Sequence, residues 1–366
     1  MPEPALAGSF WVVFLYDICE EIDLDGLRKL LGAPPSGREP SFRHLTPEYV
    51  RFERSPVVDV LDPVTLRTGE MLRRRLKYYD YGVVSIELEL DFRFGWRQLV
   101  DLAAAWMATP ELEAMASDAV RSQLKRVNSA FIKPYDYRLS EDYYIIHLRP
   151  LELADGTVLS AADLISQHGS DIAQIVRGEP LPLSDEEQTE VLRPRMSYYP
   201  NDLLVVGWTA ALLYDTPEGA APIIQLLEYA NAQLLEFRHY DHLLTDLLSG
   251  VYKSLDKGTG FLARWRLARE AERLNTMRLD VRELTERVDN SIKFLSDMFA
   301  ARVYRLAAAR IGVPDYRRLV DEKLNSAGEL YQFMVDRFHQ GRAFVLELLV
   351  VVILVIELVY LFRGKM

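Results

Sequence analysis

The feature that most constrains this chain of 366 residues is an apolar run near its C-terminus. Residues 343–362 read AFVLELLVVVILVIELVYLF, and only Glu347 and Glu357 carry a charge in this run. Twenty residues of helix rise about 30 Å, which matches the hydrocarbon core of a bilayer. The run therefore predicts a single C-terminal transmembrane helix at 343–362. The alternative is a helix buried in protein, because two carboxylates are unusual in a lipid-facing span.

The rest of the chain bears on where such a protein would reside. Its N-terminal segment has neither the basic start of a signal peptide nor the Arg-rich, acid-poor composition of a transit peptide. This arrangement predicts a tail-anchored, single-pass membrane protein with the bulk of the chain in the cytoplasm. Cys19 is the single cysteine, which excludes an intramolecular disulfide and a Cys-based zinc site. The net charge of −11 argues against a nucleic-acid binder, whose surface would normally be basic.

The first part of the chain mixes both kinds of secondary structure. Before residue 217, short β-like runs alternate with helical runs and with loops rich in Pro or Gly, which predicts an α+β domain over 1–216. The irregular rhythm favours ferredoxin-like units over a doubly wound sheet, and leaves open whether this domain has two parts. Within Arg74–Leu90, strict alternation places Ile86 and Leu88 on one face of a strand, with Glu87 and Glu89 opposite.

Further elements follow from the same patterns. We expect strands at Phe10–Tyr16, Tyr49–Arg54, Pro56–Leu61, Tyr143–Leu148 and Asn201–Leu213. We expect helices at Leu24–Leu31, at Trp96–Phe131 with a break near Pro110, and at Ala161–Arg177 with a break at Gly169.

From residue 217 onward the chain changes character and becomes almost wholly helical. Three long helices are expected, at about 222–253, 260–310 and 315–362, and they predict a coiled-coil-like hairpin over 217–342 that continues into the apolar run. The second helix carries apolar residues at heptad spacing, which indicates a buried seam. The seam consists of Leu267, Leu274, Met277, Val281, Leu284, Val288 and Leu295.

Three short motifs occur in a suggestive order along the chain. They are the aromatic segment Tyr78–Val84, the helical segment Val320–Asn325, and the paired Leu346-Glu347 and Ile356-Glu357 in the apolar run. In this order they resemble the "required for meiotic nuclear division" family, a family of membrane proteins of unknown function with mitochondrial members. The segment Ser249–Gly260 departs from that family's pattern, so the chain would be a distant member, and its excess of arginine over lysine favours a bacterial one.

The resemblance carries several expectations. It implies an α+β N-terminal half, a helical C-terminal half and one terminal membrane helix, with no enzymatic activity and no cofactor. It also implies a link to the translation machinery, because mitochondrial relatives are thought to support that machinery at the inner membrane.

The strongest candidate for metal binding lies in the segment LLEFRHYDHLLTD. Its residues Glu236, His239, His242 and Asp246 share one side of a helix, and Glu-x-x-His forms half of a carboxylate di-iron motif. The second half is missing from the sequence, and four ligands from one helix cannot enclose an ion. We therefore assign no metal site and no catalytic residue, and keep these four residues as weak candidates.

Two groups of charged residues raise questions of binding. The basic run Arg73–Lys77 could contact acidic lipid or RNA phosphate, but a solvated strand entry is the simpler interpretation. Glu347 and Glu357 are ten residues apart, so on a helix they lie about 80° apart and share one side. That placement favours a role in helix–helix association.

These observations favour a non-catalytic role. The sequence predicts a tail-anchored membrane scaffold or assembly factor that self-associates or recruits a helical protein partner to the membrane. The alternative is a soluble oligomer whose apolar tail is buried at a subunit interface. A third hypothesis is a metal-dependent enzyme that uses the region of His239 and His242.

Overall fold

The computed structural model describes most of the chain. The described residues are 5–32, 56–66, 69–135, 139–152, 156–256, 269, 271–283 and 298–363. Within the helices, the side chains of residues 254–256, 337–349 and 360–362 lie outside this description. The predicted strand Tyr49–Arg54 and the seam residues Leu267, Leu284, Val288 and Leu295 also fall outside the described residues.

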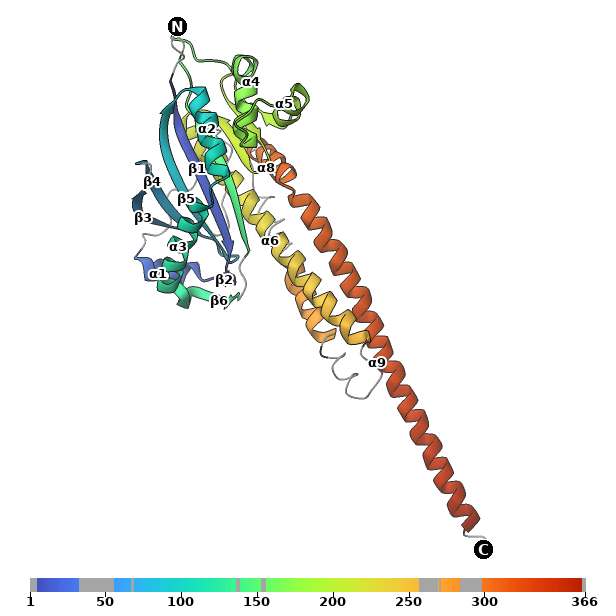
Figure 1. Ribbon diagram of the computed structural model, residues 1–366. Helices are drawn as coiled ribbons and strands as arrows, with labels where there is room; N and C mark the ends of the chain where they lie inside the picture. The colour runs from blue at the N-terminus through green and yellow to red at the C-terminus, as the bar shows by residue number, and fades with distance from the viewer. Residues whose placement is uncertain are drawn as a thin grey trace. The chain divides into compact units, whose positions relative to one another are not determined.

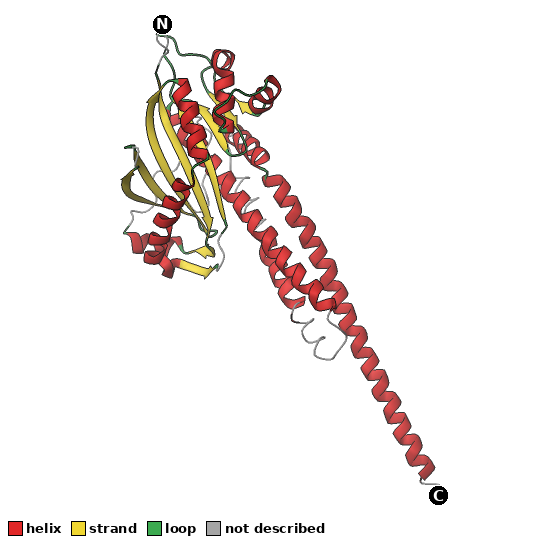
Figure 2. Cartoon of the chain, viewed as in Figure 1, coloured by secondary structure: helices red, strands yellow, loops and turns green. Residues whose placement is uncertain are grey.

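A large mixed sheet forms the centre of the N-terminal part (Figures 1 and 2). It has eight strands in the order β3-β4-β5-β1-β7-β10-β9-β8, and all neighbours are antiparallel except the parallel pair β7 and β10. Its strands are β1 (Leu6–Asp17), β3 (Val57–Thr65), β4 (Met71–Tyr78), β5 (Val83–Phe94), β7 (Ser140–Leu148), β8 (Arg195–Met196), β9 (Leu203–Val206) and β10 (Ala210–Tyr214). A small second sheet pairs β2 (Cys19–Ile22) with β6 (Phe131–Pro134).

The helices lie on the sheet and in the C-terminal half. They are α1 (Leu24–Leu31), α2 (Trp96–Met107), α3 (Pro110–Val127), α4 (Ala161–Arg177), α5 (Asp185–Leu192), α6 (Pro217–Asp256), α8 (Met298–Ile311) and α9 (Val313–Arg363), with a 3-10 turn at Asn128–Ala130. Figure 1 shows α2 and α3 lying along one face of the sheet.

One face of this sheet forms the main hydrophobic core. Side chains alternate between the two faces of a strand, so Ile86 and Leu88 of β5 point to the same side as Val12 and Phe14 of β1. All four are buried in a single apolar cluster together with residues of α2, α3 and α4. The alternation predicted for Arg74–Leu90 is therefore confirmed at its β5 end.

Several predicted helix boundaries are confirmed. The helix α1 begins after Asp23, whose carboxylate accepts hydrogen bonds from the first-turn amides, and it ends at Gly32 in the left-handed conformation. The predicted break near Pro110 separates α2 from α3, since proline is well accommodated in a first helical turn. The irregularity predicted at Gly169 of α4 falls one residue earlier, at His168.

A glycine makes the turn between β4 and β5 possible. Gly82 has a φ of 94°, a backbone conformation that residues with a side chain rarely adopt. A Cβ atom there would also collide with the carbonyl oxygen of Cys19. This close approach lets the backbone amide of Ile18 donate to the carbonyl of Gly82 at 3.1 Å. The turn is therefore anchored to the end of β1.

The predicted ferredoxin-like units are wrong. Such a unit has four strands and two crossover helices, each of which joins parallel strands, whereas β1 here is antiparallel to both of its neighbours in a sheet of eight strands. The pairings of β1 with β5 and β7, and of β7 with β10, join segments far apart in the chain, and no local pattern in the sequence encodes them. The described chain is thus a mixed α/β protein with one large sheet.

The predicted transmembrane helix at 343–362 is also wrong, and with it the tail anchor and the single-pass localisation. No helix among the described residues combines the length and the apolar character that crossing a membrane requires.

The chain divides into two compact units. The first comprises Met1–His239 with Val288–Tyr316, and the second comprises Tyr240–Arg287 with Arg317–Met366. In the second unit, Leu274 and Val281 are buried, and Met277 packs against a small apolar cluster that includes Leu274 and Ala327. The described seam residues therefore face the interior of this unit.

Candidate functional site: a charged cavity on the sheet

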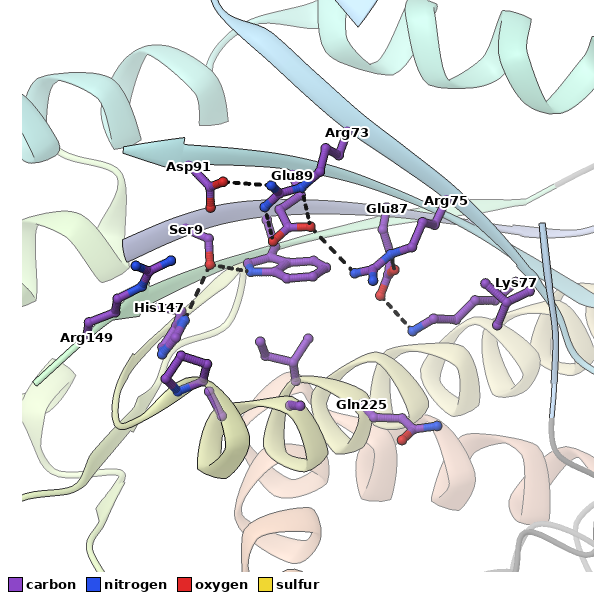
Figure 3. Close-up of a pocket in the computed structure, with 16 residues that line it drawn as sticks. Ser9, Arg73, Arg75, Lys77, Glu87, Glu89, Asp91, His147, Arg149 and Gln225 are labelled. Carbon is purple, nitrogen blue, oxygen red and sulfur yellow. Dashed lines mark hydrogen bonds and ion pairs between the residues drawn. The ribbon is translucent and has the colours of Figure 1, made fainter. Parts of the chain in front are cut away.

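The face of the sheet opposite the apolar core carries rows of charged side chains. Alternation along β4 and β5 places three basic and three acidic residues on this face, and the antiparallel register sets them against one another. Arg73 lies opposite Glu89, and Arg75 lies opposite Glu87. The six residues are Arg73, Arg75, Lys77, Glu87, Glu89 and Asp91, all visible in Figure 3.

At the outer end of this ladder, Arg73 joins two carboxylates. Its Nη2 atom lies 2.8 Å from Oε1 of Glu89, and its Nη1 atom lies 2.7 Å from Oδ2 of Asp91. Hydrogen bonds to Glu89 and Asp91 raise the pKa of Arg73 further above its usual range. Because Arg73 and Asp91 are about half exposed, solvent screens this end of the ladder.

At the inner end, the ladder becomes a buried ion cluster. The Nζ atom of Lys77 lies 2.6 Å from Oε1 of Glu87, and Oε2 of Glu87 accepts from Nε of Arg75 at 2.9 Å. Glu228 of α6 is fully buried, and it accepts hydrogen bonds from Lys77 and from the hydroxyl of Ser85. This cluster ties α6 to the sheet within the first unit.

Burial and neighbouring opposite charges shift the pKa values of these groups in opposite directions. Burial disfavours the ammonium of Lys77, but the carboxylates of Glu228 and Glu87 outweigh it and raise its pKa. For Glu87, burial opposes ionisation, yet Lys77 and Arg75 together lower its pKa. For Glu228, burial prevails and raises its pKa. Lys77 is thus the cation on which both buried carboxylates depend.

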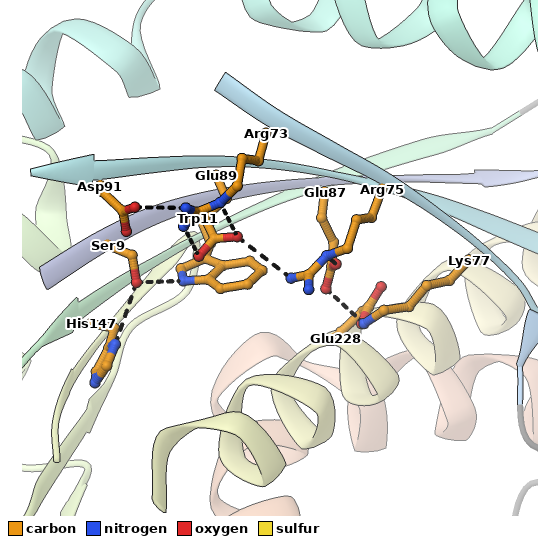
Figure 4. A network of polar contacts seen from close by, with 10 residues as sticks. All are labelled: Ser9, Trp11, Arg73, Arg75, Lys77, Glu87, Glu89, Asp91, His147 and Glu228. Atoms are coloured by element: carbon orange, nitrogen blue, oxygen red, sulfur yellow. Dashed lines mark hydrogen bonds and ion pairs between the residues drawn. The ribbon is translucent and has the colours of Figure 1, made fainter. Parts of the chain in front are cut away.

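A second polar chain crosses the neighbouring strands β1 and β7 (Figure 4). The indole nitrogen of Trp11 donates to the hydroxyl of Ser9 at 3.0 Å, and Ser9 Oγ lies 3.3 Å from Nδ1 of His147. Nε2 of His147 lies 2.9 Å from the backbone carbonyl of Asp215. A carbonyl can only accept, so Nε2 carries the proton, Nδ1 accepts, and Ser9 is its donor. The guanidinium of Arg75 lies 4.7 Å from the centre of the Trp11 ring.

The protonation of His147 makes stability depend on pH. Burial lowers the pKa of His147 below its ordinary value of 6.5, so the unfolded chain binds a proton there at a higher pH than the folded chain. We expect the free energy of unfolding to fall as the pH drops from about 7 to about 5, with this group contributing at most ~1.4 kcal/mol per pH unit. Urea unfolding at both pH values should show a smaller loss in His147→Gln, and an equal loss would contradict the assignment.

The two polar chains line a cavity of about 430 Å³ (Figure 3). One wall is the sheet, with Ser9, Trp11 and the charged ladder. The other wall is the start of α6, where the small side chains of Ala220 and Ala221 leave room between helix and sheet. Arg149, which follows β7, and Gln225 of α6 complete the polar lining.

The four weak metal candidates do not assemble into a site. Glu236 and His239 are buried in the first unit, and His239 Nδ1 lies 3.0 Å from Oδ2 of the buried Asp17. In the second unit, the exposed side chains of His242 and Asp246 lie 3.6 Å apart. Across the described ranges, no group of three or more His, Cys, Asp or Glu side chains could hold a metal ion.

Only part of the cavity can be recognised from the sequence. The basic run Arg73–Lys77 stands out there, but it indicates a solvated strand entry or a contact for acidic lipid or RNA phosphate. In the structure Arg73, Arg75 and Lys77 pair with carboxylates of the same chain. The alternation of bases on one strand and acids on the next was a usable signal. Ser9 and His147, which line the cavity, and Glu228, which joins the buried ion cluster, carry no such signal, because only long-range packing brings them there.

A separate feature lies on α9 in the second unit. Nine apolar side chains between residues 350 and 359 are each 48–57% exposed, and the tenth position, Glu357, is exposed as well. The side chain of Glu347 lies outside the described residues, so the predicted pairing of Glu347 with Glu357 in association stays a prediction. The nine residues are Val350, Val351, Val352, Ile353, Leu354, Val355, Ile356, Leu358 and Val359.

Comparison with known proteins assigns the chain to a family. A family model matches residues 7–221, more than half of the chain, so the chain belongs to the family described as Uncharacterized protein MJ0711, N-terminal domain. The Uncharacterized protein MJ0711 of Methanocaldococcus jannaschii is 18% identical over 305 residues, which cover 83% of this chain and 85% of that protein. No solved structure matches the chain.

This finding corrects the resemblance to the "required for meiotic nuclear division" family. That resemblance depended on short motifs, mostly between residues 200 and 362, whereas the family match covers the sheet and its helices over 7–221. The aromatic segment Tyr78–Val84 has a structural explanation, because it forms the end of β4 and the turn into β5. The implied link to translation thereby loses its basis.

Proposed function

We propose that the chain is a non-catalytic assembly protein that associates with further copies of itself through the apolar segment of α9, residues 350–359. The observation that carries this proposal is the exposure of nine apolar side chains in ten consecutive helical positions. A helix that is apolar on all sides is ordinarily buried in protein.

The size of this surface supports a specific contact. Nine such side chains at about half exposure present on the order of 700 Å² of apolar area, above the ~300–600 Å² of the largest patch on a typical monomer. The same area is close to the ~800 Å² that each partner contributes to a standard protein interface. One copy of the segment therefore offers about the surface that a second copy needs.

The chemistry of the segment favours an identical partner. It offers no cation and a single acid, Glu357, so recognition would depend on apolar packing, and two copies are complementary without further specialisation. Symmetric association of identical chains is also the commonest form of protein assembly. Glu357 would then sit within or beside the packed helices, where a polar residue can select the register at some cost in stability.

The proposal is tested with Ile353→Asp combined with Ile356→Asp in the full chain. These positions are three residues apart and share a helix face, so two charges would have to be buried in the contact. Size-exclusion chromatography with light scattering should show an oligomer for the wild type and a single chain for the variant at micromolar concentration.

The control is Leu319→Asp, which introduces a charge at an exposed apolar residue of α9 outside the apolar segment. It should leave the oligomer intact. A wild-type chain that is monomeric under these conditions, or a double variant with an unchanged oligomer, would overturn the proposal.

A further inference from the structure

The ion pairs around the charged cavity leave an imbalance of pairing. Four cations and three acids line the cavity, and a fourth acid, Glu228, pairs with Lys77 from outside the lining. All of these acids contact Arg73, Arg75 or Lys77. Among the described residues, Arg149 is the lining cation that makes no ion pair with a carboxylate. Figure 3 shows it at the same end of the cavity as Ser9 and His147.

From this imbalance we propose that the cavity binds a small organic anion, with a carboxylate or phosphate group held by Arg149 and an apolar body against α6. The proposal concerns the first unit and does not depend on self-association through α9.

The sign of the ligand follows from the pairing of the lining charges. An incoming ammonium ion would have to displace Arg73, Arg75 or Lys77 from a carboxylate before it could bind one. An incoming carboxylate or phosphate finds Arg149 available, and the half-exposed guanidinium of Arg73 lies in the same lining. Arginine also presents a planar set of donors that matches both anions.

The shape and the walls of the cavity define the rest of the ligand. A volume of about 430 Å³ lies within the usual range of small-molecule sites. The α6 wall is apolar, with Pro217, Ala220, Ala221 and Ile224, and it faces a polar sheet wall that contains Trp11. One apolar and one charged wall suit a ligand with an apolar body and a single anionic end.

The test uses three probes that share an aromatic ring. Benzoate carries a carboxylate, phenyl phosphate carries a phosphate, and benzylammonium carries the opposite charge on the same body. Calorimetric titration of the full chain should show binding of at least one anion and no comparable binding of benzylammonium. The relative affinities of benzoate and phenyl phosphate then distinguish the two anionic groups.

Two variants connect binding to the cavity. Arg149→Gln removes the unpaired cation from an exposed position and should weaken anion binding about tenfold or more. Ala221→Phe places a ring in the cavity from an exposed position of α6 and should abolish binding. The control Lys29→Gln makes the same change in charge at an exposed position of α1 and should leave binding unchanged.

Each remaining outcome would overturn the proposal. Absence of anion binding at millimolar concentration, stronger binding of benzylammonium, or equal anion affinity in wild type, Arg149→Gln and Ala221→Phe would each show that the cavity is not an anion site.

Discussion

Replacing Lys77 with methionine is expected to lower the free energy of unfolding by about 3–5 kcal/mol, because it leaves buried carboxylates without their shared cation. Glu87 would keep Arg75 as a partner, but Glu228 would keep only the hydroxyl of Ser85 among the partners described above. Urea unfolding of the full chain, followed by tryptophan fluorescence, measures the effect.

Two further variants distinguish the stability cost of disrupting the buried cluster from the cost of losing any positive charge. Lys133→Met removes an ion pair with Glu20 in which the lysine is largely exposed, so its cost should stay below about 1 kcal/mol. Adding Glu228→Gln to Lys77→Met should recover part of the lost stability, because a neutral amide replaces the unpaired carboxylate. If Lys77→Met costs no more than Lys133→Met, the buried cluster does not stabilise the contact between α6 and the sheet.

The second large effect is expected in the helical unit. Leu274 is fully buried in a cluster with Ala271, Ala327 and Leu330, so Leu274→Asp both removes apolar packing and buries a charge without a partner. We expect a loss of about 4 kcal/mol or more in the stability of this unit, within the range that such core changes produce. Hydrogen exchange should show faster exchange of the amides in residues 271–283.

The matched control lies on the same helical segment. Leu279 is 57% exposed, so Leu279→Asp should change the stability of the unit by less than about 0.5 kcal/mol. Similar exchange rates in both variants would mean that the heptad pattern does not mark the buried side of this segment.

Local elements of the fold could be predicted from the sequence because their signals are local. Asp23 and Gly32 bound α1, Pro110 separates two helices, and the alternation in β5 separates an apolar from a charged face. The order of strands could not be predicted in the same way. The pairing of β10 with β7 joins residues more than 60 positions apart, and neither strand carries a motif that identifies the other.

The cavity shows the same division between local and long-range information. Arg73, Arg75 and Lys77 precede Glu87, Glu89 and Asp91 across one turn, so a hairpin register would have predicted the ladder. Glu228 enters the cluster from a helix 151 positions after Lys77, and nothing in its helical pattern distinguishes it from a surface glutamate. His147 reaches Ser9 across 138 positions.

The position of β1 within the sheet delays the completion of its strand pairing during synthesis. β1 leaves the ribosome before both of its neighbours, β5 and β7, which end only at Phe94 and Leu148. At synthesis rates of roughly 5–20 residues per second, this apolar strand waits on the order of 10 s for its second partner. Until then at least one of its edges is open to pairing with other chains, and a chaperone or rapid translation of residues 83–148 would limit that pairing.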